Sequence, residues 1–99
     1  MATQESVRER TDIDVREPKM YQVIMLNDDF TTMEFVVKIL VDIFHKEPLL
    51  AETLMMDVHK RGRAVVGKYP YDIAVTKVNE ALNRAKEEGF PFRLAIEEE

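Results

Sequence analysis

The segment that decides the fold runs from residue 20 to residue 44 and reads MYQVIMLNDDFTTMEFVVKILVDIF. It begins with an apolar run, Met20 to Leu26, whose composition favours a strand with at least one buried face. Its second half, from Phe35 to Phe44, leaves only a narrow polar stripe for water, which is typical of a helix almost surrounded by protein. Thr31 and Glu34 fit a capping box, so we expect this helix to begin there. A short acidic loop therefore joins a strand to the central helix of the domain.

The remainder of the chain predicts two more helices and two more strands. Pro48 is favoured at a first helical position and Gly62 is favoured just after a helix end, so we expect a helix between them. An apolar run from Arg63 to Tyr69 predicts the second strand. A third helix follows Pro70 and stops near Gly89, and the alternating pattern of residues 92–97 predicts the last strand.

This order, strand, two helices, strand, helix, strand, predicts an α+β fold: a three-stranded antiparallel sheet with three helices packed on it. A length of 99 residues with 45% hydrophobic residues suits one domain, which we expect to span residues 18–99. Residues 1–17 are dense in charge and have no strand or helix period, so we expect a disordered N-terminal arm.

The composition excludes several classes of protein. There is no cysteine for a disulfide or a thiolate metal cluster, and no apolar run approaches the length of a membrane span. The net charge of −5 argues against a nucleic-acid binder, and the basic cluster at residues 60–63 is more typical of a solvated helix end. We expect a soluble, monomeric, cytoplasmic protein that needs no cofactor and binds neither nucleic acid nor membrane.

Two patterns suggest a binding site. Asn27, Asp28 and Asp29 place two carboxylates and an amide between a strand and a helix, where adjacent acids favour a cationic partner. Met55, Val58 and His59 share one face of the helix that begins at Pro48, because they stand at i, i+3 and i+4. Spacing alone leaves two interpretations of the second pattern open: a core stripe with a histidine at its rim, or the wall of a ligand pocket.

Other chemistry has weaker support. Asp28, Asp29, His45 and His59 are potential metal ligands, but their spacing fits no zinc motif, so we predict no metal site. Asp29 and His59 could serve a small acid/base enzyme, yet the chain has no nucleophile-elbow or phosphate-loop motif, so we predict no catalysis.

Four further motifs stand in order along the chain: Asn-Asp-Asp-Phe-Thr-x-Met-Glu-Phe-Val from Asn27, Leu-Met-x-x-Val-His from Leu54, Gly-Arg-Ala-Val-Val-Gly from Gly62, and Asp-x-Ala-x-Thr-Lys-Val from Asp72. Taken together they resemble the ClpS family, the adaptors of the bacterial N-degron pathway. The resemblance keeps one register from about Met20 to Ile96. It implies a non-enzymatic adaptor that captures proteins with N-terminal Leu, Phe, Tyr or Trp. The adaptor hands them to the N-terminal domain of a ClpA-type AAA+ unfoldase, which feeds the ClpP peptidase.

The resemblance also implies roles for individual residues. The α-amine and first peptide unit of the captured protein would be bound by Asn27, Asp28, Asp29, Thr31 and His59. The first side chain would enter a pocket lined by Met33, Val36, Met55, Val58 and, from the last strand, Phe92. Docking on the unfoldase would use Asp72, Thr76 and Lys77. The arm before Pro18 would be engaged by the unfoldase during delivery.

One departure from the family pattern lies in the loop, where Thr32 stands in place of the usual proline. A different interaction domain without preference for any N-terminal residue is the alternative, because a small α+β fold does not by itself define a function.

Overall fold

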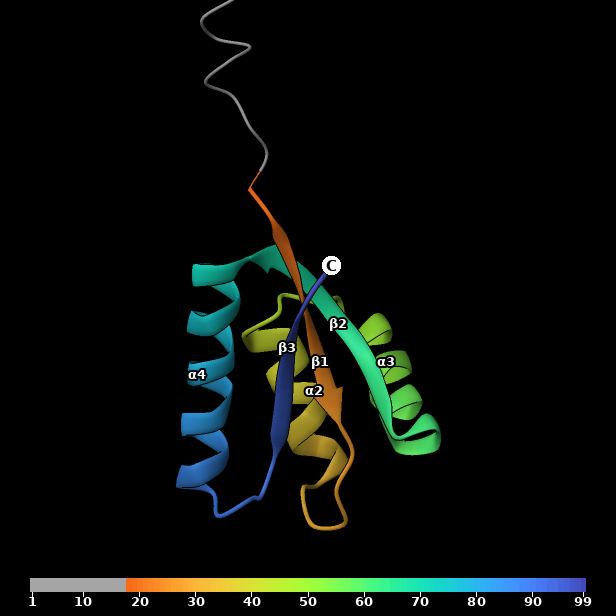
Figure 1. The fold of residues 1–99 in the computed structure, drawn as a ribbon. Coiled ribbons are helices and arrows are strands. Elements are labelled where there is room, and N and C mark those ends of the chain that lie inside the picture. The colour runs from red at the N-terminus through yellow and green to blue at the C-terminus, as the bar shows by residue number, and fades with distance from the viewer. Residues whose placement is uncertain (1–17) are drawn as a thin grey trace, which may run out of the picture.

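The computed structural model describes residues 18–99, and its elements follow the order predicted from the sequence (Figure 1). They are β1 (Met20–Leu26), α2 (Met33–Asp42), α3 (Pro48–Arg61), β2 (Arg63–Pro70), α4 (Tyr71–Glu87) and β3 (Arg93–Glu98). The predicted α+β class, with three strands and three helices, is confirmed. The predicted disordered arm, residues 1–17, lies outside the described residues.

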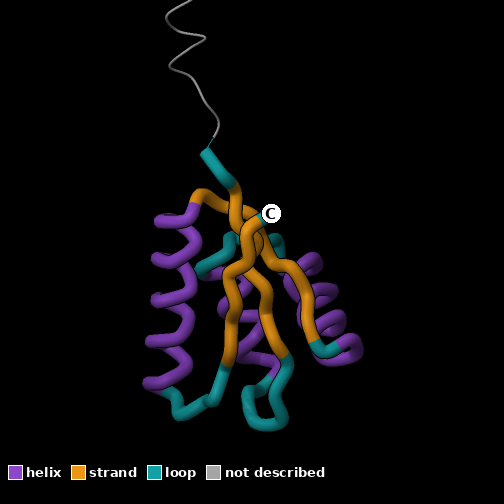
Figure 2. The backbone as a smooth tube through the Cα atoms, in the orientation of Figure 1, coloured by secondary structure: helices purple, strands orange, loops and turns teal. Residues whose placement is uncertain are grey.

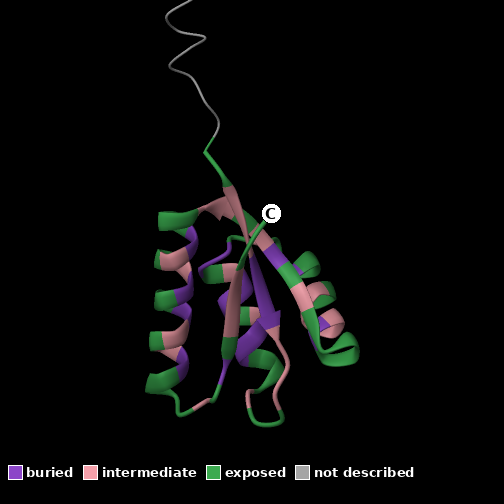
Figure 3. Cartoon of the chain, viewed as in Figure 1, coloured by how far each residue is buried: buried purple, intermediate pink, exposed green. Residues whose placement is uncertain are grey.

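The sheet has the order β2-β1-β3, and both neighbouring pairs are antiparallel. Val23 and Met25 of the central strand belong to the core, together with the inward faces of the three helices. Figure 3 shows that the buried segments of the helices lie toward the sheet, while their outer faces are exposed. The hydrophobic core therefore fills the space between the sheet and the helix layer.

The opposite face of the sheet carries one buried residue, Ile24, which is 1% exposed. Arg63 pairs with Leu26 in the strand register, and Glu97 pairs with Gln22, so these two charged residues flank Ile24 on the outer strands. Their side chains form an ion pair at 3.5 Å, which crosses the sheet over Ile24. The aliphatic parts of the two long side chains thereby cover this position.

The central helix begins and ends slightly inside its predicted bounds. Thr32, not Thr31, is the N-cap of α2, and its hydroxyl oxygen accepts a hydrogen bond of 3.1 Å from the N–H of Phe35. The predicted capping box of Thr31 and Glu34 is thus wrong. The hydroxyl of Thr31 instead donates to the carboxylate of Asp28, which leaves the next threonine to cap the helix.

The turn that joins α3 to β2 lies beside the end of β1. Gly62 follows α3 with a φ of 88°, a left-handed conformation that glycine adopts without steric cost. Its carbonyl oxygen accepts a hydrogen bond of 2.9 Å from the N–H of Asn27. Figure 2 shows the resulting arrangement: the loop between β1 and α2 lies at the same end of the molecule as the turn between α3 and β2.

Candidate binding site

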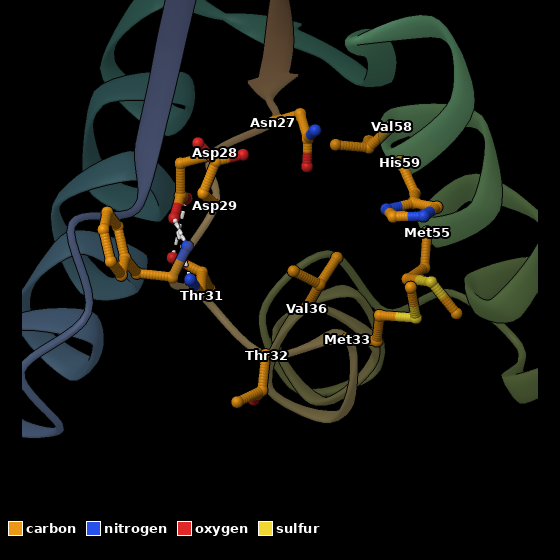
Figure 4. Close-up of a pocket in the computed structure, with 11 residues that line it drawn as sticks. Asn27, Asp28, Asp29, Thr31, Thr32, Met33, Val36, Met55, Val58 and His59 are labelled. Atoms are coloured by element: carbon orange, nitrogen blue, oxygen red, sulfur yellow. Dashed lines mark hydrogen bonds between the residues drawn. The ribbon is translucent and has the colours of Figure 1, made fainter.

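A cavity of about 400 Å³ opens between the β1–α2 loop, the start of α2 and the last turns of α3. Its lining residues are Asn27, Asp28, Asp29, Phe30, Thr31, Thr32, Met33, Val36, Met55, Val58 and His59. Figure 4 shows that the loop residues lie on one side of the opening and the residues of α3 on the other. The two sequence patterns that suggested a site thus meet in space.

Asp28 organises the loop. Its Oδ1 atom accepts hydrogen bonds from the N–H groups of Phe30 and Thr31 at 2.8 and 2.7 Å, and its Oδ2 atom accepts one from the Thr31 hydroxyl at 2.7 Å. Partial burial opposes ionisation of Asp28. The hydrogen bonds from Thr31 and Phe30, together with the charge of Arg93, nevertheless hold the pKa of this carboxyl below its usual range. Asp28 is therefore an ionised acceptor already engaged within its own loop.

The backbone of Asn27 is held from two sides. Its N–H donates to Gly62, and its carbonyl oxygen accepts a hydrogen bond of 3.1 Å from the guanidinium of Arg93 in β3. These bonds connect the loop to α3 and to the sheet edge. The Asn27 side chain is left free to face the cavity, where Figure 4 shows it opposite Val58 and His59.

Three polar side chains at the mouth of the cavity make no hydrogen bond or ion pair with any of residues 18–99: the Asn27 amide, the Asp29 carboxylate and the His59 imidazole. Asp29 and His59 are exposed. His59 lies in the last turn of α3, one residue after the buried Val58. The mouth thus offers an amide oxygen, a carboxylate and an imidazole nitrogen to a ligand.

The wall of the cavity is apolar. Met33 and Val36 come from the first turn of α2, and Met55 and Val58 come from α3, one helical turn apart. The interpretation of Met55, Val58 and His59 as a pocket wall is thus the one that the geometry favours. Val58 is also part of the core, so the wall rests on a packed interior.

Phe92 does not line this cavity. It lies just before β3, is buried, and packs edge-on against Phe35 with ring centroids 5.7 Å apart. Successive helical residues point about 100° apart, so the side of α2 that carries Phe35 turns away from the wall formed by Val36. The prediction that Phe92 forms part of the pocket is not met.

Two lining residues were not among the predicted site residues: Phe30 and Thr32. Phe30 is 75% exposed at the tip of the loop, where its ring has no core to enter. In the sequence, Phe30 is a lone aromatic residue between an acid and a threonine in a polar loop. This pattern could have indicated a binding residue, because aromatic residues are enriched at binding surfaces.

The three residues predicted to dock on a partner all lie in the first half of α4, away from the cavity. Asp72 and Thr76 are exposed, and the Thr76 hydroxyl donates to the Asp72 carbonyl oxygen at 2.9 Å. Lys77 is half-buried. Its ammonium group donates to the carbonyl oxygen of Ile43 at 2.8 Å and lies 5.3 Å from the ring centroid of Tyr69. Lys77 therefore has a structural contact within the domain.

Neither a metal nor a membrane is suggested by the described part of the chain. Residues 18–99 contain no group of three or more histidine, cysteine or acidic side chains that could hold a metal ion. Within the same residues, none of the helices combines the length and the apolar character needed to cross a bilayer.

The fold and the cavity together define a small α+β binding domain. The cavity volume lies near the lower end of the range for small-molecule sites, about 300 to 1,000 Å³. The cavity therefore suits one side chain or a ligand of similar size. Its acceptors suit a ligand that carries hydrogen-bond donors and positive charge beside an apolar group.

Comparison with known proteins gives this domain a family. The family described as "ATP-dependent Clp protease adaptor protein ClpS" matches residues 16–95. Curated ClpS adapter proteins include one from Acetivibrio thermocellus, 46% identical over 99 residues with 100% of both chains covered. Another, from Treponema denticola, is 54% identical over 81 residues, covering 82% of this chain and 80% of that protein.

A solved structure agrees with these matches. Agrobacterium tumefaciens ClpS2, determined bound to L-phenylalaninamide, superimposes with a TM-score of 0.80 at 42% identity and covers 84% of this chain and 100% of that one. The chain belongs to the ClpS family of Clp protease adaptors, as its sequence motifs predicted. The family is one of adapter proteins by name, and not of enzymes.

Proposed function

We propose that this protein captures polypeptides by their N-terminal residue and delivers them for degradation. The captured residue is Leu, Phe, Tyr or Trp with a free α-amine, and the recipient is a ClpA-type AAA+ unfoldase that feeds ClpP. One observation carries the proposal: the free side chains of Asn27, Asp29 and His59 surround the mouth of an apolar cavity.

The chemistry of an N-terminus matches this mouth. A free α-amine has an ordinary pKa of about 7.7 to 8.0, so it is mostly cationic at neutral pH and carries three donors. The carboxylate of Asp29 supplies negative charge, and the Asn27 amide oxygen and a ring nitrogen of His59 supply acceptors. Asp28 adds the field of a second carboxylate, while Thr31 keeps that carboxylate in place.

The first side chain would fill the apolar part of the cavity. Burial of a Leu or Phe side chain contributes roughly 1.5 to 3 kcal/mol, and each charge-assisted hydrogen bond contributes about 1.5 to 3 kcal/mol. The thioethers of Met33 and Met55 adapt to branched and flat side chains alike. After the cost of ordering, these terms are consistent with dissociation constants in the micromolar range, about −8 kcal/mol.

The solved relative supports the same ligand class. L-phenylalaninamide, bound to Agrobacterium tumefaciens ClpS2, is an amino acid amide with a free α-amine and an aromatic side chain. Those are the two features for which the mouth and wall of the present cavity are suited.

A binding panel tests the capture step. Fluorescence anisotropy would compare labelled peptides that differ only in the first residue, each with a free and an acetylated N-terminus. We expect binding for Leu, Phe, Tyr and Trp, and a loss for Ala or after acetylation. Equal affinity for free and acetylated Leu peptides would exclude the amine site. Equal affinity for all first residues would favour a general interaction domain, and turnover of the peptide would favour an enzyme.

Delivery would use a separate surface. Asp72 and Thr76 are exposed at the start of α4, next to the exposed apolar residues Tyr71 and Ile73. We expect deletion of residues 2–16 to leave peptide affinity unchanged and to abolish degradation of a Leu-tagged substrate by the unfoldase and ClpP. A truncated protein that lost peptide binding would contradict the division between capture and delivery.

A further inference from the structure

A second hollow lies beside the candidate cavity, between α2 and α3. It has a volume of about 490 Å³, and the residues around it are Met33, Glu34, Val37, Glu52, Met55 and Met56. We call it the methionine groove. Met33 and Met55 line both hollows, so these two side chains lie at the boundary between them. Figure 4 shows the two methionine side chains next to each other at the wall of the candidate cavity.

The methionine groove has a distinct chemistry. Its floor is apolar, and among residues 18–99 the ionisable ones that line it are Glu34 on α2 and Glu52 on α3. Both glutamates are exposed, and neither forms an ion pair or hydrogen bond with any of residues 18–99. An apolar floor with two free carboxylates at its rim suits a long aliphatic stem that ends in a cation.

We propose that the methionine groove binds a lysine or arginine side chain close behind the first residue of the captured polypeptide. This inference rests on the proposed function, because it requires the first side chain to occupy the neighbouring cavity. In an extended chain, side chains alternate between two sides, and residues one and three lie on the same side about 7 Å apart. The two hollows share the side chains of Met33 and Met55, so a third residue on the same side as the first would be placed at the groove once the first is seated.

Other occupants fit the groove less well. An acidic side chain would meet two like charges, and a short polar side chain would leave the methionine floor uncovered. A purely apolar side chain would use the floor but leave both carboxylates without a partner. Lysine and arginine can use both the apolar floor and the carboxylates. The groove therefore adds a preference for a basic residue to the selection of the first side chain by the cavity.

The experiment is an affinity series on peptides that begin with Leu and carry Lys, norleucine, Gln or Glu at position 3. A parallel series moves the Lys to positions 2 and 4. Two exposed ion pairs of ordinary strength predict that Lys at position 3 binds about threefold to tenfold more tightly than Gln at low salt. Glu should bind more weakly than Gln, and norleucine should fall between Lys and Gln. The Lys advantage should be largest at position 3 and should shrink in 0.5 M salt, where the screening length falls to about 4 Å.

Variants locate the effect. The double change E34Q/E52Q should abolish the advantage of Lys over Gln. The double change E80Q/E87Q removes the same charge from α4 and should leave that advantage intact. Met56→Ser should weaken binding of both the Lys and the norleucine peptide without altering the affinity of a peptide with Gly at position 3.

The outcomes separate this inference from the function on which it rests. If Leu peptides with Gln at position 3 do not bind, both proposals fail. If they bind but Lys gives no advantage, or if the advantage survives in E34Q/E52Q, only the methionine groove is excluded.

Discussion

Asp28 and Asp29 are adjacent residues of the same type with different contacts. Both oxygens of Asp28 accept hydrogen bonds from Phe30 and Thr31, whereas Asp29 is exposed and makes no such bond within residues 18–99. The sequence identified the acidic loop, but the division between a carboxylate that shapes the loop and one that is free for a ligand depends on backbone geometry. Residue type and spacing do not contain that information.

This division predicts different effects of alanine at the two positions. Asp28→Ala should destabilise the domain by about 1 to 2 kcal/mol, because it removes three acceptor contacts. In a domain of this size, that loss lowers Tm by roughly 4 to 16 °C. Asp29→Ala should change stability by at most about 0.5 kcal/mol but weaken binding of Leu peptides. Thermal unfolding and anisotropy measured on both variants check this, and equal loss of stability in the two would contradict the assignment.

The contribution of Asp28 to stability also depends on pH. Its pKa is lowered in the folded state, so its stabilising effect is complete above the ordinary aspartate value of 3.8. The effect is lost as pH falls below that value toward the lowered native pKa. The difference in Tm between wild type and Asp28→Ala should therefore be constant from pH 7 to 5 and decrease below about pH 4. A difference that persists unchanged at pH 2.5 would exclude the charged acceptor role.

His59 is proposed to accept a hydrogen bond from the captured amine, which requires an unprotonated ring nitrogen. The His59→Ala variant should therefore bind Leu peptides roughly tenfold or more weakly than wild type, because a hydrogen bond to a charged group contributes about 1.5 to 3 kcal/mol. Fluorescence anisotropy on the two proteins at the same pH checks this, and equal affinities would remove His59 from this role.

At the scale of elements, most bounds follow from local patterns. The apolar run of β1, the proline and glycine that enclose α3, and the alternation of β3 are all features of adjacent residues, and each predicted its element to within a few positions. The start of α2 was shifted by one residue, because Thr31 and Thr32 are equally suitable caps in sequence. Only the contact between Thr31 and Asp28 decides between them.

Thr32 gives a prediction about this helix start. Thr32→Ala removes the bond to the Phe35 N–H and should cost about 1 kcal/mol. Thr32→Pro removes the same bond, but the φ of −73° at this position is close to that of proline. Proline also restricts the unfolded chain, and this restores about 0.4 to 1 kcal/mol of the free energy of unfolding. In urea unfolding, the free energy of unfolding of Thr32→Pro should lie between those of Thr32→Ala and wild type. A Thr32→Pro variant less stable than Thr32→Ala would contradict this account.

At the scale of the whole molecule, contacts between distant elements determine the surroundings of individual side chains, which local sequence patterns do not specify. Docking of Lys77 on the unfoldase stays a prediction from its motif, and the fold adds a second contact, a hydrogen bond from its ammonium group to the carbonyl oxygen of Ile43 at the end of α2. Phe92 is predicted to line the pocket, but it packs against Phe35 of α2 and is not among the residues that line the cavity. Both outcomes depend on how α2 lies against α4 and the sheet, and no local pattern specifies this.

The Lys77 contact has a measurable consequence. A hydrogen bond from a charged group contributes about 1.5 to 3 kcal/mol, less where solvent screens it, so Lys77→Ala should destabilise the domain by about 1 to 2 kcal/mol. Lys86→Ala, an exposed lysine near the other end of α4, should change stability by at most about 0.5 kcal/mol. Urea unfolding compares the two variants. If Lys77→Ala is as stable as Lys86→Ala, the contact contributes nothing and the lysine is free for docking.

The central claim is that one cavity holds an α-amine and an apolar side chain together. An NMR titration of the ¹⁵N-labelled protein with L-leucinamide tests this most directly, with N-acetyl-L-leucinamide as the control. We expect saturable shifts confined to residues 27–36 and 55–62 with the free amine, and no saturable shifts with the acetylated compound. Equal shifts from both compounds, or shifts centred on another surface, would contradict the claim.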